Sequence, residues 1–126
     1  MLDNIIHQGK LMYFVDALLP EMEDSLKIGY TAKQIQWAEN NEAEMWNFLV
    51  ENKMLYSNRR MDILRYINDG PYTTGFPIES PARSGTWLGW QIVRQFMNKH
   101  GEVTLPQLMA NKNYQEILNE SDYYPE

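Results

Sequence analysis

"SGTWLGWQIVRQFMNKH", residues 84–100, places two glycines inside an apolar pattern of helical period. Gly85 and Gly89 are four residues apart, so they lie on one face of the predicted helix. Because they lack a Cβ, they let another helix or a loop approach the backbone closely. Ser80 or Ser84 is the candidate N-cap. Trp87 and Trp90 point to different sides, so we expect one in the core and the other exposed.

Helical patterns continue on both sides of this stretch. They predict helices over residues 2–19, 31–52 and 61–67 before it, and short helices over 105–111 and 114–122 after it. Thr31 with Gln34, three residues later, has the pattern of a capping box, and Pro20 ends the first helix. No segment alternates long enough to predict a strand. The predicted fold is all-α, with five or six helices in one domain over residues 1–126.

Two segments are predicted as loops. Residues 20–30, "PEMEDSLKIGY", are acidic and follow directly after the first helix. Residues 69–82, "DGPYTTGFPIESPA", contain three prolines and two glycines, which punctuate regular structure. We expect this long loop to be ordered, because Tyr72, Phe76 and Ile78 give it side chains to bury.

Composition limits the possible functions. The chain has 126 residues, of which 44% are hydrophobic and 13% aromatic, enough for a core. Its net charge is −6 with only 11 Lys and Arg, so binding of nucleic acid through phosphate neutralisation is not expected. The absence of cysteine excludes thiol catalysis, thiolate zinc sites and disulfides.

The sequence also predicts no membrane anchor in this chain. No apolar run approaches the roughly 18 residues of a transmembrane helix. The N-terminus has neither a basic-then-apolar signal peptide nor a lipidation cysteine. The chain alone therefore leaves its location open.

No motif for metal or nucleophilic chemistry is present in the sequence. His7 and His100 are far apart and lack the His-Glu-x-x-His pattern of zinc peptidases. We expect His7 to be partly buried and His100 to end a helix as a cation or a solvent residue. The serines lie in turn or cap contexts, outside any G-x-S-x-G elbow. We therefore predict no catalytic residue, no metal and no cofactor.

Several charged residues lie where the helical pattern is otherwise apolar. Glu42 lies on the apolar face of the second predicted helix, and Lys10 lies beside Tyr13 in the first. A carboxylate on such a face costs free energy unless it is paired. We expect Glu42 to pair with Lys10, Arg83 or Arg94. The alternatives are a general acid or base with a raised pKa, a solvated edge, and a small-molecule pocket beside Lys10, Glu42 and Arg83.

Three aromatic residues are candidates for an interaction surface. Trp37 and Phe48 lie off the main apolar stripe of the second helix, and Trp87 is one of the two tryptophans of residues 84–100. Exposed aromatic patches mark surfaces that bind partners. The alternative is a second face packed inside a multi-helix domain.

The order of these features resembles a known family. The carrying segments are "HQGKLMYFVDALLP", "KIGYT" with "QIQWAENNEAEMWNFLVENKMLYS", "ESPARSGTWLGWQIVRQFM" and "ILNESDYYP". Together they resemble the C-terminal half of the gliding-motility lipoprotein GldB family of Bacteroidetes, over roughly residues 5–125. The resemblance implies a non-catalytic binding or scaffolding domain in the cell envelope, with a protein partner in gliding or secretion machinery.

The same family is distantly similar to predicted zinc peptidases, which supplies an alternative function. In that group the metal motif lies upstream, and a later helix offers a glutamate before a glycine as a further ligand. Here the residue before Gly9 is Gln8, a neutral amide and a poor zinc ligand. The alternative is therefore the C-terminal part of a zincin-like metallopeptidase or hydrolase whose metal motif lies on an upstream segment.

Overall fold

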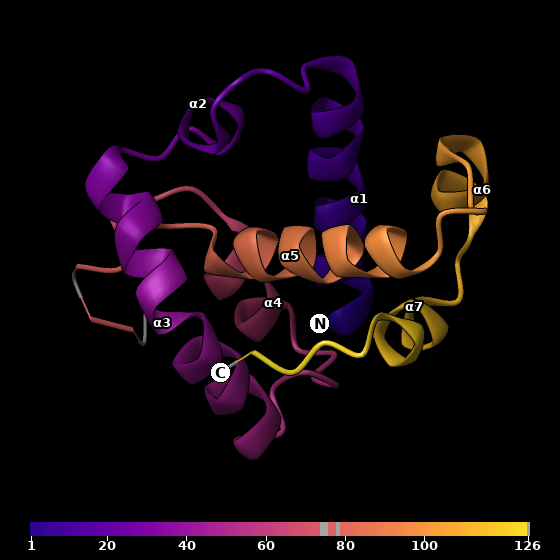
Figure 1. Cartoon of the computed structure of the whole chain (residues 1–126). Helices are drawn as coiled ribbons and strands as arrows, with labels where there is room; N and C mark the ends of the chain where they lie inside the picture. Colours follow the sequence, from indigo (N-terminus) through magenta and orange to yellow (C-terminus); the bar gives the residue numbers. More distant parts are fainter. Residues whose placement is uncertain (74–75, 78, 126) are drawn as a thin grey trace.

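The computed structural model describes residues 1–73, 76–77 and 79–125, and its regular elements are seven α-helices. They are α1 (Leu2–Leu18), α2 (Asp24–Ile28), α3 (Ala32–Glu51), α4 (Arg60–Ile67), α5 (Ser84–Lys99), α6 (Leu105–Ala110) and α7 (Tyr114–Ser121). Figure 1 shows α5 crossing α1 near the middle of the molecule, with α3 on one side and α6 and α7 on the other. The predicted all-α class is confirmed.

The crossing of α1 and α5 is the centre of the fold, and two glycines make it possible. A Cβ on Gly89 would overlap the carbonyl oxygen of Ile5, and a Cβ on Gly9 would overlap that of Gly89. The two backbones are therefore in direct contact, closer than helices with side chains at the crossing can come. Ile5 and the neighbouring Ile6 are fully buried beside this contact.

The second glycine of α5 serves a different helix. A Cβ on Gly85 would lie 2.8 Å from the carbonyl oxygen of Tyr66 in α4. The predicted close approach at both glycines of α5 is therefore confirmed. The expectation that one tryptophan is exposed is wrong, because Trp87 and Trp90 are both buried, with ring centroids 5.8 Å apart. Helix α5 is surrounded on all sides through its first half, so neither side of it is free.

Two predicted helix starts are confirmed by their hydrogen bonds. At the start of α3, Thr31 Oγ1 accepts from the backbone N–H of Gln34 at 3.2 Å, while Gln34 Oε1 accepts from the N–H of Thr31 at 2.8 Å. The same reciprocal pair joins Thr104 and Gln107 at the start of α6. Such capping boxes satisfy N–H groups that the first helical turn leaves unpaired.

The acidic segment 20–30 is not wholly a loop, because it contains the short helix α2. Gly29 ends this helix with φ 78° and ψ 28°, a left-handed conformation that glycine adopts at little cost. Its backbone N–H donates to Ser25 O at 2.8 Å. A helix of five residues has too few positions to show a helical period. The sequence pattern therefore missed it.

The predicted loop at residues 69–82 forms no regular helix in its described part, and Ile78 lies outside the described residues. Phe76 packs partly buried against the core, as expected. The Thr73 hydroxyl bonds to Pro81 O at 2.7 Å and to Ser84 Oγ at 2.9 Å. The predicted serine N-cap is wrong, because Arg83 occupies that position in a left-handed conformation. Ser84 instead lies buried as the first residue of α5.

Within the described ranges, no helix has both the length and the apolar composition that crossing a bilayer requires.

Candidate functional site

Lys10 lies buried between α1 and the segment that joins α6 to α7. It is 2% exposed, its Nζ donates to Asn111 O, and it lies 4.9 Å from the centroid of the Tyr114 ring. Burial, with the nearby cation of Lys112, lowers the pKa of Lys10. No described carboxylate lies within ion-pair distance of it. Its partners are a carbonyl and an aromatic face, and Tyr13 packs partly buried on the same helix.

Arg83 holds the start of α5 against α2. It has φ 57° and ψ 36°, its guanidinium makes an ion pair with Asp69 at 2.8 Å, and it donates to Ile28 O at 2.5 Å. The hydroxyl of Tyr30 donates to Ala82 O at 2.5 Å, just before this position. Arg83 is therefore tied to the backbone of α2 and to the 69–82 loop, which is a positioning role in the fold.

Glu42 is partly buried in α3 and faces two aromatic side chains. Burial raises the pKa of Glu42, while the nearby hydroxyl of Tyr123 and indole N–H of Trp87 act in the opposite direction. Both of these polar groups are buried, and neither makes a hydrogen bond of normal geometry within the described residues. The Glu42 carboxylate in turn adds to the burial that raises the pKa of Tyr123.

The expected ion pair between Glu42 and a basic residue is therefore not formed in the part of the chain that the structure describes. Lys10 bonds to a carbonyl, Arg83 to Asp69 and Arg94 to other carboxylates. Lys10 lies in α1, Glu42 lies in α3, and Arg83 and Arg94 lie at the start of α5 and within it. None of Lys10, Glu42 and Arg83 lines the pockets of about 700, 540 and 330 Å³ that the described residues form.

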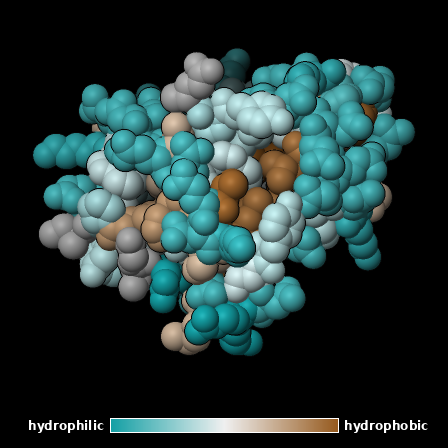
Figure 2. All heavy atoms as spheres, turned by 90° about the horizontal axis from the view of Figure 1, so that it is seen from below, coloured by the Kyte–Doolittle hydropathy of each residue, from teal (hydrophilic) through white to brown (hydrophobic). Residues whose placement is uncertain are grey.

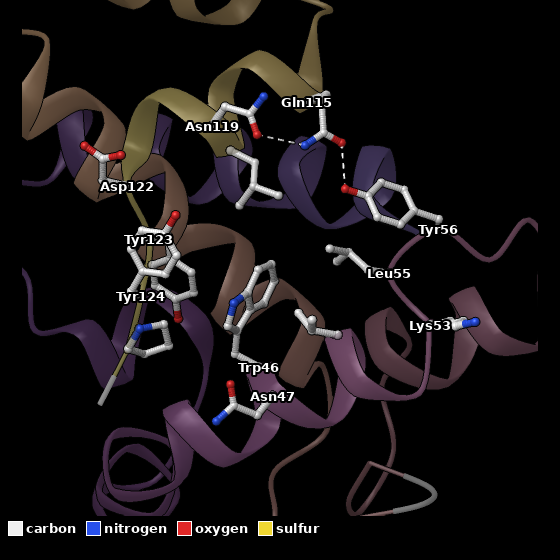
Figure 3. A pocket seen from close by; sticks show the side chains of 13 residues that line it. Trp46, Asn47, Lys53, Leu55, Tyr56, Gln115, Asn119, Asp122, Tyr123 and Tyr124 are labelled. Carbon is white, nitrogen blue, oxygen red and sulfur yellow. Dashed lines mark hydrogen bonds between the residues drawn. The ribbon is translucent and has the colours of Figure 1, made fainter.

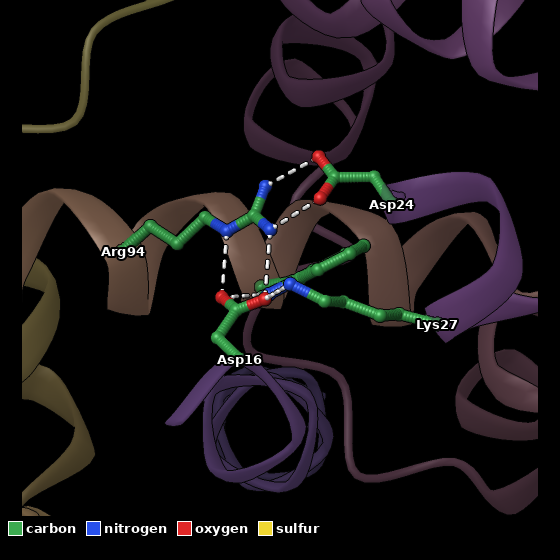
Figure 4. A network of polar contacts seen from close by, with 5 residues as sticks. Asp16, Asp24, Lys27 and Arg94 are labelled. Carbon is green, nitrogen blue, oxygen red and sulfur yellow. Dashed lines mark hydrogen bonds and ion pairs between the residues drawn. The ribbon is translucent and has the colours of Figure 1, made fainter. Parts of the chain in front are cut away.

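Arg94 belongs to a polar network that sequence reasoning did not find (Figure 4). Its guanidinium binds Asp16 at 2.9 Å and Asp24 at 2.8 Å, and lies 3.7 Å from the Trp90 ring centroid. Lys27 also donates to Asp16, at 2.9 Å. Burial alone would raise the pKa of Asp16, but hydrogen bonds from Arg94, Lys27 and Trp90 outweigh it and hold the pKa below its usual value. The network joins α1, α2 and α5.

Trp37 and Phe48, the two aromatic residues of α3 outside its main apolar face, line one cleft on the surface. Trp37 and Phe48 line a cleft of about 330 Å³ with Phe76, whose ring stands at 78° to that of Phe48 with centroids 5.4 Å apart. We call this the Trp37–Phe48 cleft. Its remaining lining consists of Asn41, Glu44, Met45, Pro77 and Glu79. The third predicted surface residue is wrong, because Trp87 is 2% exposed and lies in the core.

A larger pocket of about 700 Å³ opens between α3 and α7, and we call it the α3–α7 pocket. Its lining is rich in aromatic and amide side chains: Trp46, Asn47, Val50, Lys53, Leu55, Tyr56, Gln115, Leu118, Asn119, Asp122, Tyr123, Tyr124 and Pro125. Figure 2, seen from below, shows hydrophobic atoms in a hollow rimmed by hydrophilic ones. The only signal in the sequence was the aromatic pair in "DYYP", whose position beside α3 no local pattern specifies.

The histidines do not share a site. His7 is exposed on α1, contrary to the expectation that it is partly buried. His100 is the C-cap residue of α5, and its Nε2 lies 3.0 Å from Glu120 O. Across residues 1–73, 76–77 and 79–125, no group of three His, Cys, Asp or Glu side chains is arranged to hold a metal ion.

Comparison with known proteins places this fold in a family. Comparisons with curated proteins and with solved structures gave no significant match. The family model described as "Gliding motility protein GldB" matches residues 1–125, nearly the whole chain. The match includes both helices of the glycine crossing and all of the lining of the α3–α7 pocket. The chain therefore belongs to the gliding motility protein GldB family.

Proposed function

We propose that this chain is a non-catalytic binding domain of the gliding-motility machinery in the cell envelope, and that it docks a protein partner on the Trp37–Phe48 cleft. Membership of the GldB family supports the gliding-motility part of the proposal. The observation that carries the binding part is the aromatic cleft itself. Phe48 remains 37% exposed although it has an aromatic neighbour, Phe76, against which it packs edge to face.

The chemistry of the cleft specifies the kind of partner. Aromatic side chains in a concave surface are the common anchors of protein interfaces. Glu44 and Glu79 place two carboxylates on its lining, and the whole chain has a net charge of −6. Complementary charge steers association and selects partners. The fitting partner segment therefore presents an apolar side chain flanked by Lys or Arg.

The placement of the polar residues supports a role without catalysis. A catalytic site brings its acid, base and binding groups within hydrogen-bond reach of one reacting atom. Here Lys10 of α1 binds a carbonyl just after α6, and Arg83 fixes the start of α5. Glu42 of α3 faces polar groups of Trp87 and Tyr123. Each of these contacts holds the fold, and the three residues do not converge.

The first test is photo-crosslinking of a partner at the Trp37–Phe48 cleft in gliding cells. A photo-crosslinking amino acid at position 48 should capture a defined protein, and the charge reversals Glu44→Lys and Glu79→Lys should abolish that product. The same amino acid at position 26, an exposed leucine of α2, is the matched control and should give no such product. Phe48→Ala should impair gliding and lower the unfolding free energy by about 1 kcal/mol, because it also removes the aromatic pair with Phe76.

Two results would contradict the proposed function. Normal gliding of the Phe48→Ala, Glu44→Lys double variant would show that the Trp37–Phe48 cleft is not needed for gliding. Cleavage of peptides by the purified chain, lost with a chelator, would favour the peptidase alternative over a binding domain.

A further inference from the structure

We propose that the α3–α7 pocket is a carbohydrate-binding site for a short neutral oligosaccharide. The ligand would lay the apolar face of its sugar rings on the exposed side chains of Tyr124 and Val50 and present its hydroxyl edge to α7. This site is separate from the Trp37–Phe48 cleft and adds a second, chemically different ligand to a protein-docking domain. Figure 3 shows the pocket with its lining side chains.

The pocket has the size and shape of a ligand site. Its volume is about 700 Å³, inside the range of roughly 300–1,000 Å³ that small-molecule pockets occupy. In Figure 3, Gln115 and Asn119 of α7 lie on one side, and Trp46 and Asn47 of α3 lie on the opposite side. The two sides differ in chemistry, so a ligand with one apolar face and one polar edge matches both.

The apolar side is held in place before any ligand arrives. Trp46 lies buried at the base of the pocket. The Trp46 ring packs edge to face against Tyr123, with ring centroids 5.2 Å apart. Tyr124, the next residue, also lines the pocket and is 81% exposed. Aromatic faces prefer contact with the slightly positive hydrogens of C–H groups. A sugar ring presents such C–H groups on its flat faces.

The polar side is a hydrogen-bonded row of neutral groups. Tyr56 Oη donates to Gln115 Oε1 at 2.8 Å, and Gln115 Nε2 donates to Asn119 Oδ1 at 3.0 Å. This row leaves one N–H of Gln115, two N–H groups of Asn119 and the lone pairs of Tyr56 Oη for a ligand. The row therefore offers an acceptor at Tyr56 and donors at Gln115 and Asn119. Hydroxyl groups, which both donate and accept, match both kinds of group.

The charged residues of the pocket do not favour a charged ligand. Lys53 and Asp122 lie at opposite ends in Figure 3. Asp122 is already paired with Lys99 of α5, and Lys53 makes no ion pair among the described residues. The centre of the pocket between them is lined by amides and aromatic rings, and a ligand charge placed there would lose water without gaining a counter-ion.

A proline-rich peptide is the competing occupant, since such peptides dock into aromatic-lined grooves. The backbone of a proline-rich segment offers carbonyl acceptors and few N–H donors. The hydroxyl hydrogen of Tyr56 is already donated to Gln115, so this oxygen can only accept. That acceptor would have no donor from a proline-rich chain. The sugar satisfies both kinds of group.

The test is a binding experiment observed at the pocket itself. The ¹⁵N-labelled chain is titrated with neutral hexasaccharides of four linkages: β-1,4-glucan, β-1,3-glucan, α-1,4-glucan and chitin. We expect at least one to shift, saturably, the indole N–H signal of Trp46 and the side-chain amide signals of Gln115 and Asn119. The indole signal of Trp90, which lies in the core and bonds to Asp16, serves as the internal control and should stay in place.

Two exposed residues of the polar side can be changed without disturbing the core. Asn119→Ala and Tyr56→Phe should each weaken binding of the responding sugar about fivefold, as expected for loss of one hydrogen bond to a neutral group. The matched controls are Asn40→Ala, on the exposed side of α3, and Tyr72→Phe, neither of which lies in the pocket. Both should leave the dissociation constant unchanged.

Three outcomes would overturn the proposal. One is the absence of a saturable shift with all four sugars. Another is a sugar response that Asn119→Ala and Tyr56→Phe leave unchanged, which would place binding elsewhere. The third is a shift of the same signals by a proline decapeptide with no response to any sugar, which would assign the pocket to peptide recognition. None of these results bears on the Trp37–Phe48 cleft, so the two proposals fail separately.

Discussion

At the scale of single residues, Glu42 shows how an aromatic environment can replace an ion pair. Its carboxylate faces the indole N–H of Trp87 and the hydroxyl of Tyr123, which are both buried polar donors. These groups stabilise the ionised form less than burial destabilises it, so the pKa of Glu42 is raised. Ionised Glu42 is therefore a cost to the folded state at neutral pH.

This cost predicts how stability depends on pH at this residue. Because the folded pKa is raised, the contribution of Glu42 is most favourable below its unfolded pKa of about 4.5 and is lost as pH rises through the folded value. Glu42→Gln keeps an acceptor for both donors without the charge. We expect it to raise the unfolding free energy at pH 7 and to have little effect at pH 4, as measured by urea denaturation.

The matched control is Glu51→Gln, at the exposed end of the same helix, which should change little at either pH. A Glu42→Gln variant less stable than the parent at pH 7 would mean that an unrecognised cation pairs with the carboxylate.

The sequence could identify Glu42 and Lys10 as unusual, because helical geometry alone places them among apolar neighbours. It could not identify their partners, because these come from distant segments. Lys10 bonds to the carbonyl of Asn111, and any residue type at position 111 would offer that carbonyl. A backbone carbonyl is present at every residue, so the sequence cannot show which one binds a lysine. Charged side chains are visible in the sequence, and for this reason we expected an ion pair.

At the scale of elements, the crossing of α1 over α5 depends on two missing side chains. The backbones touch at Gly9 and Gly89, and the neighbouring Ile5 is completely buried there. A contact between backbones cannot be relieved by a change of side-chain rotamer. Any added atom must therefore move a whole helix.

Substitution of this glycine should be costly. Gly89→Ala introduces a Cβ that overlaps the carbonyl oxygen of Ile5. We expect a loss of about 3 kcal/mol in unfolding free energy, the upper end of the usual range for overpacking. Gly101→Ala is the control, because open space surrounds Gly101 and its φ is not left-handed. It should be neutral, or stabilising by less than about 1 kcal/mol, by thermal or chemical unfolding.

An unchanged stability for Gly89→Ala would show that α1 and α5 are not in backbone contact. The sequence did predict that a helix or a loop approaches Gly85 and Gly89 closely, but it did not identify α1 as the partner. It also predicted the capping box at Thr31 and the short helix after Thr104, which are both local in sequence. It missed α2, since five residues contain little more than one helical turn.

At the scale of the whole molecule, the network around Asp16 joins α1 and α2 to α5, which is far from them in the chain. Arg94 of α5 reaches Asp16 of α1 and Asp24 of α2, and Lys27 of α2 also reaches Asp16. The side chains of Asp16 and Lys27 are largely removed from water. A buried cation without its carboxylate costs far more than an exposed one.

Asp16→Ala should therefore destabilise the chain by about 3 kcal/mol or more at pH 7. The pKa of Asp16 is lowered, so its contribution is complete above the unfolded pKa of about 3.8 and is lost as pH falls through the folded value. The difference between the variant and the parent should accordingly shrink on acidification, measured by denaturant unfolding across pH 2–7.

Lys99→Ala is the control for this network. Lys99 also pairs with an aspartate from α5, but both partners are largely exposed, so its loss should cost less than about 1 kcal/mol. Equal costs for the two variants would show that burial does not govern the Asp16 network.

Each pocket combines segments that sequence patterns cannot bring together. The α3 side of the Trp37–Phe48 cleft could be anticipated, because Trp37 and Phe48 share one helix, but its other side comes from the 69–82 loop. The α3–α7 pocket combines residues from α3, the following loop, α7 and the last described residues. Its existence depends on how α7 docks beside α3, and this follows from packing on α5 rather than from any local pattern.

The glycine crossing also determines the order of events during folding. Gly9 and Gly89 are separated by most of the chain, so their contact closes a very long loop, and long-range contacts of this kind slow folding. During synthesis, α1 to α4 leave the ribosome before α5 exists to cover them. The apolar surface of α1 is then exposed for the time needed to make the intervening residues, and this interval is when the nascent chain is most open to aggregation and to chaperones.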